Sequence, residues 1–357
     1  MIRISTRVQI TILALLYVLL SCAVFAFGVH KSVYSVSSTD RVYYEEFYAG
    51  ALDKNSPQRF SNPPQGTSII FAGPDGAAGL HAGIHFEPIK YAAAAVWTVF
   101  GGAHAVELFY IALFFLPLLY GGYILYARGG DTTLFLCLLA YAFSPAVLNT
   151  ATDDLRPYIA LLPGVLLFFL SVLYKRPVWE KFLFLNLVLA VREEALLLVL
   201  PVLAYLFVRE YASGISRTSW ALLFNWCGWL LANTLYIAWI APHYAVRGSW
   251  SALFSISERH LSVVLVVILV AAGVTVWALA NRDRIFSFPY LAEILLLAPF
   301  LALLVASPFL TLSAPFSSLS SVLQNISGRY GMILTVFLLM FVLAQFVDNH
   351  VRTKLFS

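Results

Sequence analysis

The stretch AVREEALLLV, residues 190–199, decides how this chain can fold, because it places three charges in a row inside a long apolar run. An ionised side chain at the centre of a bilayer costs a few kcal/mol, so such residues face a bundle interior or a wet cavity instead of lipid. Arg192, Glu193 and Glu194 are adjacent. Any fold of this chain must therefore provide polar surroundings for all three.

The composition indicates a polytopic membrane protein. Of the 357 residues, 61% are hydrophobic and only 11% are charged, which is far from the balance of a soluble domain. The net charge of +4 is small, and no basic cluster carries interleaved aromatic residues. Nucleic acid is therefore excluded as a partner.

The apolar segments predict an all-α integral membrane protein with about eight full spans, because one span needs about 20 apolar residues. The first segment is too long for a signal peptide and is expected to stay as an anchor. The region 182–208 would rise about 40 Å as one helix, enough for one tilted span but not for two. The candidate spans are 8–29, 104–127, 132–149, 157–174, 219–241, 261–280, 291–311 and 330–348.

Basic residues flank the charged region on both sides, and cytoplasmic loops carry an excess of Lys and Arg. If both flanks are cytoplasmic, both chain termini are cytoplasmic too, and most basic residues fall on the inside. If 182–208 crossed once, the basic pair 282–284 and the C-terminal pair would move outside. We therefore predict a short re-entrant helical hairpin at 182–208, with its turn near Arg192–Glu194 buried in protein or lining a wet cavity.

A single membrane domain, 1–357, is expected, with residues 30–103 forming the one long outer loop. Its early part, SSTDRVYYEEFYAGALDKN, has the pattern of a short amphipathic helix. Residues 91–102 are apolar but too short to span, so we expect a second helix in the interface. The helical bundle, 104–348, then contains the hairpin.

Acidic residues gather at the predicted outer end of the bundle, near its longest loop. A positioned carboxylate there is suited to act as a general base on an acceptor hydroxyl, and arginines are suited to hold a phosphate. The arginines that could do so are Arg156, Arg192 and Arg329.

Each of these signals also has a simpler interpretation. Glu45 and Glu46 on an amphipathic helix can be a solvated face. The Arg192–Glu194 cluster can be an ion pair that braces the hairpin. The segment HAGIHFE offers His81, His85 and Glu87 at metal-like spacing, but its glycines argue against a helix that would align both histidines, so no specific motif supports a metal.

The order of these features resembles the GT-C superfamily of polyprenyl-phosphate-dependent glycosyltransferases, and more narrowly the uncharacterised prokaryotic membrane family called domain of unknown function 2079. The resemblance covers residues 40 to 330. The stretches that carry it are YYEEFYAGAL (43–52), IHFEPI (84–89), FSPAVLNTATDDLRP (143–157), VREEALLL (191–198) and GRY (328–330).

The resemblance implies a GT-C-like bundle in the plasma membrane of a bacterium or archaeon, which takes a sugar from a lipid phosphate carrier on the outer face. It implies a catalytic acid at Glu45 or Glu46, where this chain reads YYEE instead of the family's YDLG-like stretch, and a second acid at Asp154. The substrate-binding residues that it implies, together with those from the charge pattern, are His85, Arg156, Arg192, Glu193, Glu194 and Arg329.

Two other functions fit the same sequence. A broken, charged hairpin at membrane depth is also used by secondary transporters, so a transporter or lipid flippase is an alternative, although no inverted repeat is visible. A non-catalytic assembly subunit is the third possibility. The sequence names neither the sugar nor the acceptor.

Overall fold

The computed structural model describes residues 4–34, 44, 45, 48, 86–152, 157–211, 214–236, 291–297 and 329–356. All regular structure in these residues is helical. The elements are α1 (Thr6–Tyr34), α4 (Ile89–Phe100), α5 (Ala103–Arg128), α6 (Thr132–Phe143), α7 (Pro145–Ala151), η2 (Pro157–Ala160), α8 (Leu161–Leu173), α9 (Val178–Leu189), α10 (Ala195–Leu198), α11 (Leu200–Tyr211), α12 (Arg217–Leu235), α17 (Leu291–Leu295) and α20 (Arg329–Phe356).

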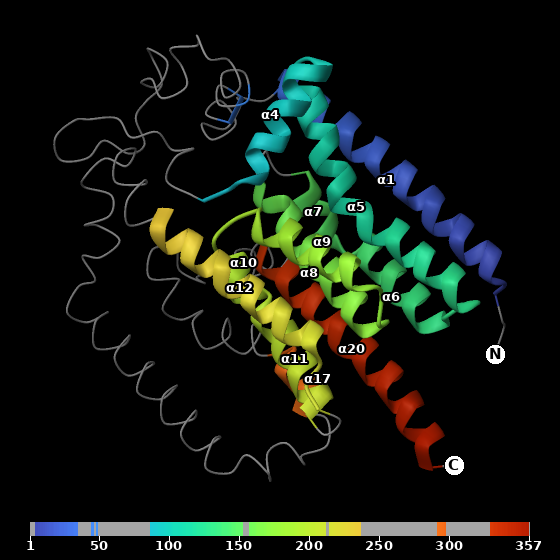
Figure 1. Cartoon of the computed structure of the whole chain (residues 1–357). Coiled ribbons are helices and arrows are strands. Elements are labelled where there is room, and N and C mark those ends of the chain that lie inside the picture. Colours follow the sequence, from blue (N-terminus) through green and yellow to red (C-terminus); the bar gives the residue numbers. More distant parts are fainter. Residues whose placement is uncertain are drawn as a thin grey trace, which may run out of the picture.

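Two of the described helices are long and apolar enough to cross a membrane, Thr6–His30 within α1 and Ala103–Arg128. They lie side by side along one edge of the bundle (Figure 1). The outer face of α1 leaves large apolar side chains exposed, among them Leu15, Leu19 and Phe27. A row of this kind is expected of a surface that contacts lipid. The fold is thus compatible with an integral membrane protein, whereas eight full spans are not seen in the described residues.

The segment expected as one span at 132–149 is a bent pair of helices. α6 and α7 meet at an angle of 55°. Ser144 has an extended backbone (φ −64°, ψ 125°) and Pro145 opens α7. A residue before proline is pushed out of the helical region, and proline suits the first turn of a helix. The pair could form a third, broken span.

Helix α8 is the centre of the bundle, because all of its residues from Leu161 to Leu173 are buried. Because every residue is buried, this helix is covered by protein on all of its faces. Its neighbours are α5, α9, α11 and α20. The close approach to α9 depends on Gly164, where an added Cβ would lie 3.0 Å from the Cβ of Val188.

Basic residues gather where α5 and α8 end and α9 begins; we call this the basic end, made of Arg128, Lys175, Arg176, Lys181 and Arg209. Arg176 forms a two-pronged pair with Glu180, with nitrogen–oxygen distances of 3.1 and 3.0 Å. Arg209 Nη1 donates to the carbonyl of Leu173 (3.4 Å) at the end of α8. Both termini of the chain point to this end (Figure 1).

Helices α9 and α11 form an antiparallel hairpin through α10. The charge of Lys181 at the start of α9 interacts with that of Glu210 near the end of α11. In one continuous helix these residues would lie about 40 Å apart. The separate break between α10 and α11 has a local cause, since Pro201 lies in the first turn of α11 and has no N–H to continue α10. The chain thus returns to the end at which it entered.

Candidate functional site

The turn of the hairpin, residues 190–194, is joined to the start of α4. The backbone N–H of Ile89 donates to the carbonyl of Ala190 (2.9 Å). Arg192 is part of this turn, and its Nε lies 2.9 Å from Glu194 Oε2 and 4.0 Å from Glu193 Oε1. The arginine therefore compensates the charge of its own neighbours. We call residues 190–194 with Glu87 and Lys90 the apex cluster.

Glu87 is the deepest member of the apex cluster. Its side chain is fully buried, and its Oε1 lies 3.8 Å from Arg192 Nε. The hydroxyl of Tyr44 donates to both carboxylate oxygens, at 3.2 and 2.9 Å. A buried carboxylate needs such partners, because desolvating its charge costs more than one contact returns. The glutamate therefore links Tyr44, the start of α4 and the hairpin turn.

Lys90 supplies a second cation and is only 4% exposed. Its ammonium interacts electrostatically with both Glu87 and Glu193. The apex cluster thus holds two cations among three carboxylates. Its most exposed acid is Glu194, whose side chain is 51% exposed while Arg192 is 16% exposed. An incoming anion can reach Arg192 from the side of Glu194.

Tyr44 and Tyr48, from the segment expected to form the outer loop, pack onto the same cluster. Tyr44 and Tyr48 stack with ring centroids 6.0 Å apart, and the Tyr48 hydroxyl lies 3.0 Å from that of Tyr110 in α5. Both tyrosines are buried. Glu45 lies between them in the chain and is half-buried, so the docking of its neighbours brings it to the apex end of the molecule.

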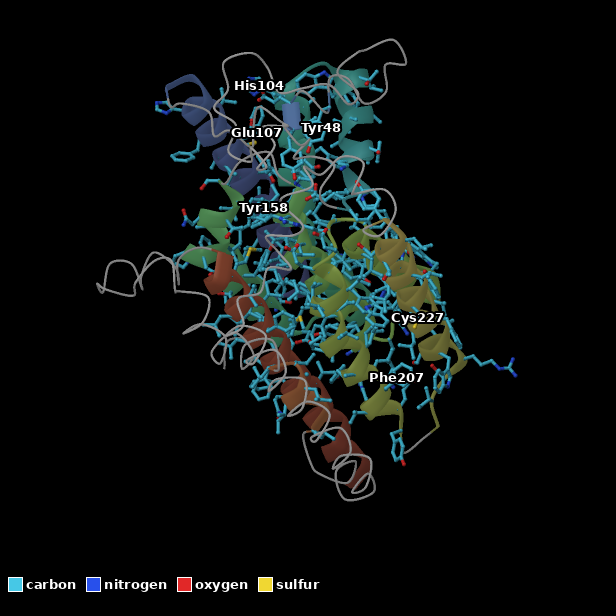
Figure 2. The ribbon with its side chains drawn as sticks, turned by 90° about the vertical axis from the view of Figure 1, so that its left-hand side faces the viewer. Tyr48, His104, Glu107, Tyr158, Phe207 and Cys227 are labelled. Atoms are coloured by element: carbon cyan, nitrogen blue, oxygen red, sulfur yellow. The ribbon has the colours of Figure 1, made fainter. Side chains whose placement is uncertain are left out.

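Figure 2 shows Tyr48 near His104 and Glu107 at one end of the bundle, with Phe207 and Cys227 lying well away from them. His104 Nδ1 lies 3.5 Å from Glu107 Oε2. Gly28 of α1 leaves room for the Glu107 carboxylate, which an added Cβ would contact directly. This pair adds a further acid to the end opposite the basic end.

Helix α12 braces the interrupted hairpin through side-chain donors. Trp226 Nε1 donates to the carbonyl of Leu196 (2.9 Å) in α10. Trp229 Nε1 donates to Asn186 Oδ1 (2.7 Å) in α9. A helix break inside a membrane is tolerated when neighbours satisfy the freed backbone groups. These hydrogen bonds hold α9 and α10 in place on either side of the apex cluster.

The predicted site residues divide into two sets. Arg192, Glu193 and Glu194 lie together, and Glu45 lies at the same end. Arg329 begins α20, and its side chain lies outside what the structure describes. The remaining predicted residues, Glu46, His85, Asp154 and Arg156, lie outside the described residues.

Sequence reasoning did not pair Glu87 with Arg192, nor did it select Tyr44 or Lys90. One signal was present, because Glu87 stands in FEPI directly before a helix start. In the part of the chain that the structure describes, no three His, Cys, Asp or Glu side chains are grouped to hold a metal ion. His81 and His85 of the metal-like spacing lie outside that part, whereas Glu87 lies within it.

The arrangement can do two things chemically. Its guanidinium and ammonium groups can bind a phosphate, for which Arg192 offers a planar donor fork. Its carboxylates can accept a proton from a hydroxyl. No protein-family model, no curated protein and no solved structure matches this chain. The fold and the apex cluster define an all-helical protein with membrane-compatible helices and a charged site at one end.

Proposed function

We propose that this protein is a GT-C-type membrane glycosyltransferase that takes a sugar from a polyprenyl-phosphate carrier and transfers it to an acceptor on the outer face. One observation carries the proposal, namely the buried pair of Glu87 with Arg192 at the hairpin turn, with which the charge of Lys90 also interacts. A carrier phosphate lies at the interface while its tail stays in lipid, so its binding groups must lie at this depth.

In this proposal the hairpin is re-entrant, its turn faces outward, and the basic end is cytoplasmic in a bacterial or archaeal plasma membrane. The support is the charge distribution, because Arg128, Lys175 and Arg209 share the end opposite the apex cluster. Basic residues favour the cytoplasmic side. Eight spans in all would complete the bundle.

The proposed roles follow from exposure and charge. Arg192 contacts the carrier phosphate, which replaces the exposed carboxylate of Glu194 as its partner. Glu193 or Glu194 orients the sugar or the phosphate. The general base that takes the proton of the acceptor hydroxyl is Glu45 or Glu46, with Asp154 as a further acid. His85, Arg156 and Arg329 complete the substrate-binding set.

Native mass spectrometry of the protein in mild detergent tests the carrier site. We expect a co-purified polyprenyl phosphate, or its sugar adduct, in the wild-type protein. Arg192→Ala should lose it, whereas Arg217→Ala, which removes an exposed cation outside the apex cluster, should keep it. Bulk phospholipid alone in every variant would remove the support for a glycosyltransferase.

Transfer itself is tested with Glu45→Gln, Glu46→Gln and the double variant. The proposal expects loss of sugar transfer in one single variant and in the double variant, with insertion into the membrane unchanged. Full activity in all three proteins would sink the assignment of the base.

A transporter or flippase is the second candidate, favoured by the 55° bend between α6 and α7 and by the interrupted hairpin, because transporters bind substrates at broken helices. Cysteine labelling separates the two. An apex cluster that is labelled alternately from both sides of the membrane indicates transport, and a cluster labelled only from outside indicates the enzyme.

A further inference from the structure

A second charged site lies at the basic end, far from the apex cluster. A cavity of about 470 Å³ opens there between the α5–α6 turn, the ends of α8 and α11, and α20. Among the described residues, neither the hairpin turn at 190–194 nor Tyr44, Glu45 and Tyr48 line it. The residues that line it are Arg128, Gly130, Asp131, Thr133, Leu173, Lys175, Arg209, Phe346 and Val347.

The described residues of the lining carry an excess of positive charge, with three cations and one carboxylate. That carboxylate already has partners within the fold. Asp131 Oδ1 accepts from the backbone N–H of Leu134 (3.0 Å) as the N-cap of α6, and Oδ2 accepts from the hydroxyl of Tyr174 (2.9 Å). Asp131 therefore holds the start of α6 against Tyr174, and both of its oxygens already accept hydrogen bonds within the fold.

Two of the cations are held in place by aromatic rings. The guanidinium carbon of Arg128 lies 4.7 Å from the ring centre of Tyr174, and that of Arg209 lies 5.7 Å from the ring centre of Tyr205. A guanidinium that stacks on a ring keeps its donor edge available for an anion. The positive groups are thus preorganised around the cavity.

Lys175 occupies a position that favours glycine. Its φ is 50°, and it is the one non-glycine residue with positive φ in the described residues. The N–H of Lys175 donates to Val172 O (3.1 Å) and that of Arg176 to Ser171 O (2.9 Å). This is the Schellman ending of a helix, in which the left-handed residue is usually glycine. A lysine there costs backbone strain and puts an ammonium at the cavity.

The opposite wall is apolar and continues to the outside of the bundle. Phe346 and Val347 of α20 form it, and Phe346 is 60% exposed. In a membrane this surface meets the acyl chains. A ligand that fits both walls carries a phosphate at one end and a hydrocarbon tail at the other.

We propose that this cavity binds the phosphate headgroup of an anionic phospholipid, with Arg128, Lys175 and Arg209 around the phosphate and α20 along the acyl chains. This site is independent of the function proposed for the apex cluster. Basic pockets between helices at the cytoplasmic surface are suited to such headgroups, because anionic lipids are abundant in that leaflet.

The test uses the full chain in nanodiscs of phosphatidylcholine that contain phosphatidylglycerol, read by native mass spectrometry. We expect the wild-type protein to retain phosphatidylglycerol in preference to phosphatidylcholine. Lys175→Gly should lower this retention about tenfold, the scale of one lost charge-assisted contact. Because glycine suits a φ of 50°, the melting temperature of this variant should be equal or higher, which separates binding from folding.

Two further variants make the result decisive. Arg128→Gln removes another cation from the same cavity and should lower retention as well, whereas Arg217→Gln removes an exposed cation that does not line it and should not. Unchanged retention in both Lys175→Gly and Arg128→Gln overturns the proposal. Competition by inorganic phosphate at concentrations that match the lipid would also overturn it, by showing a site for free phosphate.

Discussion

Glu87 and Glu194 share one arginine but differ in burial, which separates a buried charge from a surface ion pair. Glu87 is fully buried beside Arg192 and Tyr44, whereas the Glu194 side chain is 51% exposed. Removing Glu87 takes away the acceptor of the buried Tyr44 hydroxyl and a charge partner of the buried Lys90, whereas Arg192 keeps Glu194. An exposed pair contributes little, because water screens it.

We therefore expect Glu87→Ala to lower the free energy of unfolding by about 3 kcal/mol and Glu194→Ala to lower it by about 0.5 kcal/mol. Denaturant unfolding in detergent, followed by tryptophan fluorescence, measures both. Equal losses in the two variants would mean that Glu87 is not the buried partner of Arg192.

Only part of the apex cluster could be predicted from the sequence. Arg192, Glu193 and Glu194 could be selected because charges inside an apolar run are costly wherever the chain goes. The contact of Arg192 with Glu87 could not be predicted, because it joins segments far apart in the sequence and depends on how α4 packs. The sequence places Tyr44 in an amphipathic helix and in the family-like stretch YYEEFYAGAL, but nothing local shows that its hydroxyl contacts a buried acid.

Glu210, which follows the hairpin, supports the start of the next helix, α12. Glu210 Oε2 accepts from the backbone N–H of Ser216 (2.9 Å) and from the hydroxyl of Ser219 (2.7 Å). Ser216 is itself the N-cap of α12. Partial burial raises the pKa of Glu210, but these hydrogen bonds outweigh it, so the pKa lies below its ordinary value of 4.5.

A lowered pKa in the fold means that ionised Glu210 stabilises the protein above pH 4.5 and that this contribution disappears as the pH falls through the lowered value. We expect Glu210→Gln to be less stable than the wild type at neutral pH and the difference to shrink in acid. Thermal unfolding of both proteins across this range measures it. A difference that stays constant with pH would show that the charge of Glu210 has no part in it.

The elements differ in how far they could be predicted. The two helices that are long and apolar enough to cross a membrane could be predicted from length and apolarity alone. The re-entrant placement of the hairpin, which is expected from the basic residues on both of its flanks, stays a prediction. The bend at Ser144–Pro145 was missed, although serine followed by proline is a recognisable helix start. The length of the apolar segment 132–149 favours a single span, because it is long enough to cross the membrane as one helix, and this signal outweighs the Ser-Pro pair.

The whole molecule has two chemically different ends. The apex cluster, with its buried carboxylate, lies at one end, and the basic end, with its cavity, lies at the other. Both chain termini point to the basic end (Figure 1). This polarity could be predicted from the positive-inside rule. The cavity could not, because it arises where α8 packs with α5, α11 and α20. The left-handed backbone at Lys175 could not either, because glycine is the residue that usually signals such a helix end.

The central claim is that the hairpin enters and leaves on the basic side and exposes its turn on the other. Single cysteines at Lys175, Glu194 and Arg217 test it, in a protein whose Cys22, Cys137 and Cys227 have been replaced by serine or alanine. We expect a membrane-impermeant maleimide to label Glu194→Cys on intact cells, and Lys175→Cys and Arg217→Cys only after permeabilisation. Labelling of Lys175→Cys and Arg217→Cys from opposite sides, or of Glu194→Cys only from the inside, would contradict the claim.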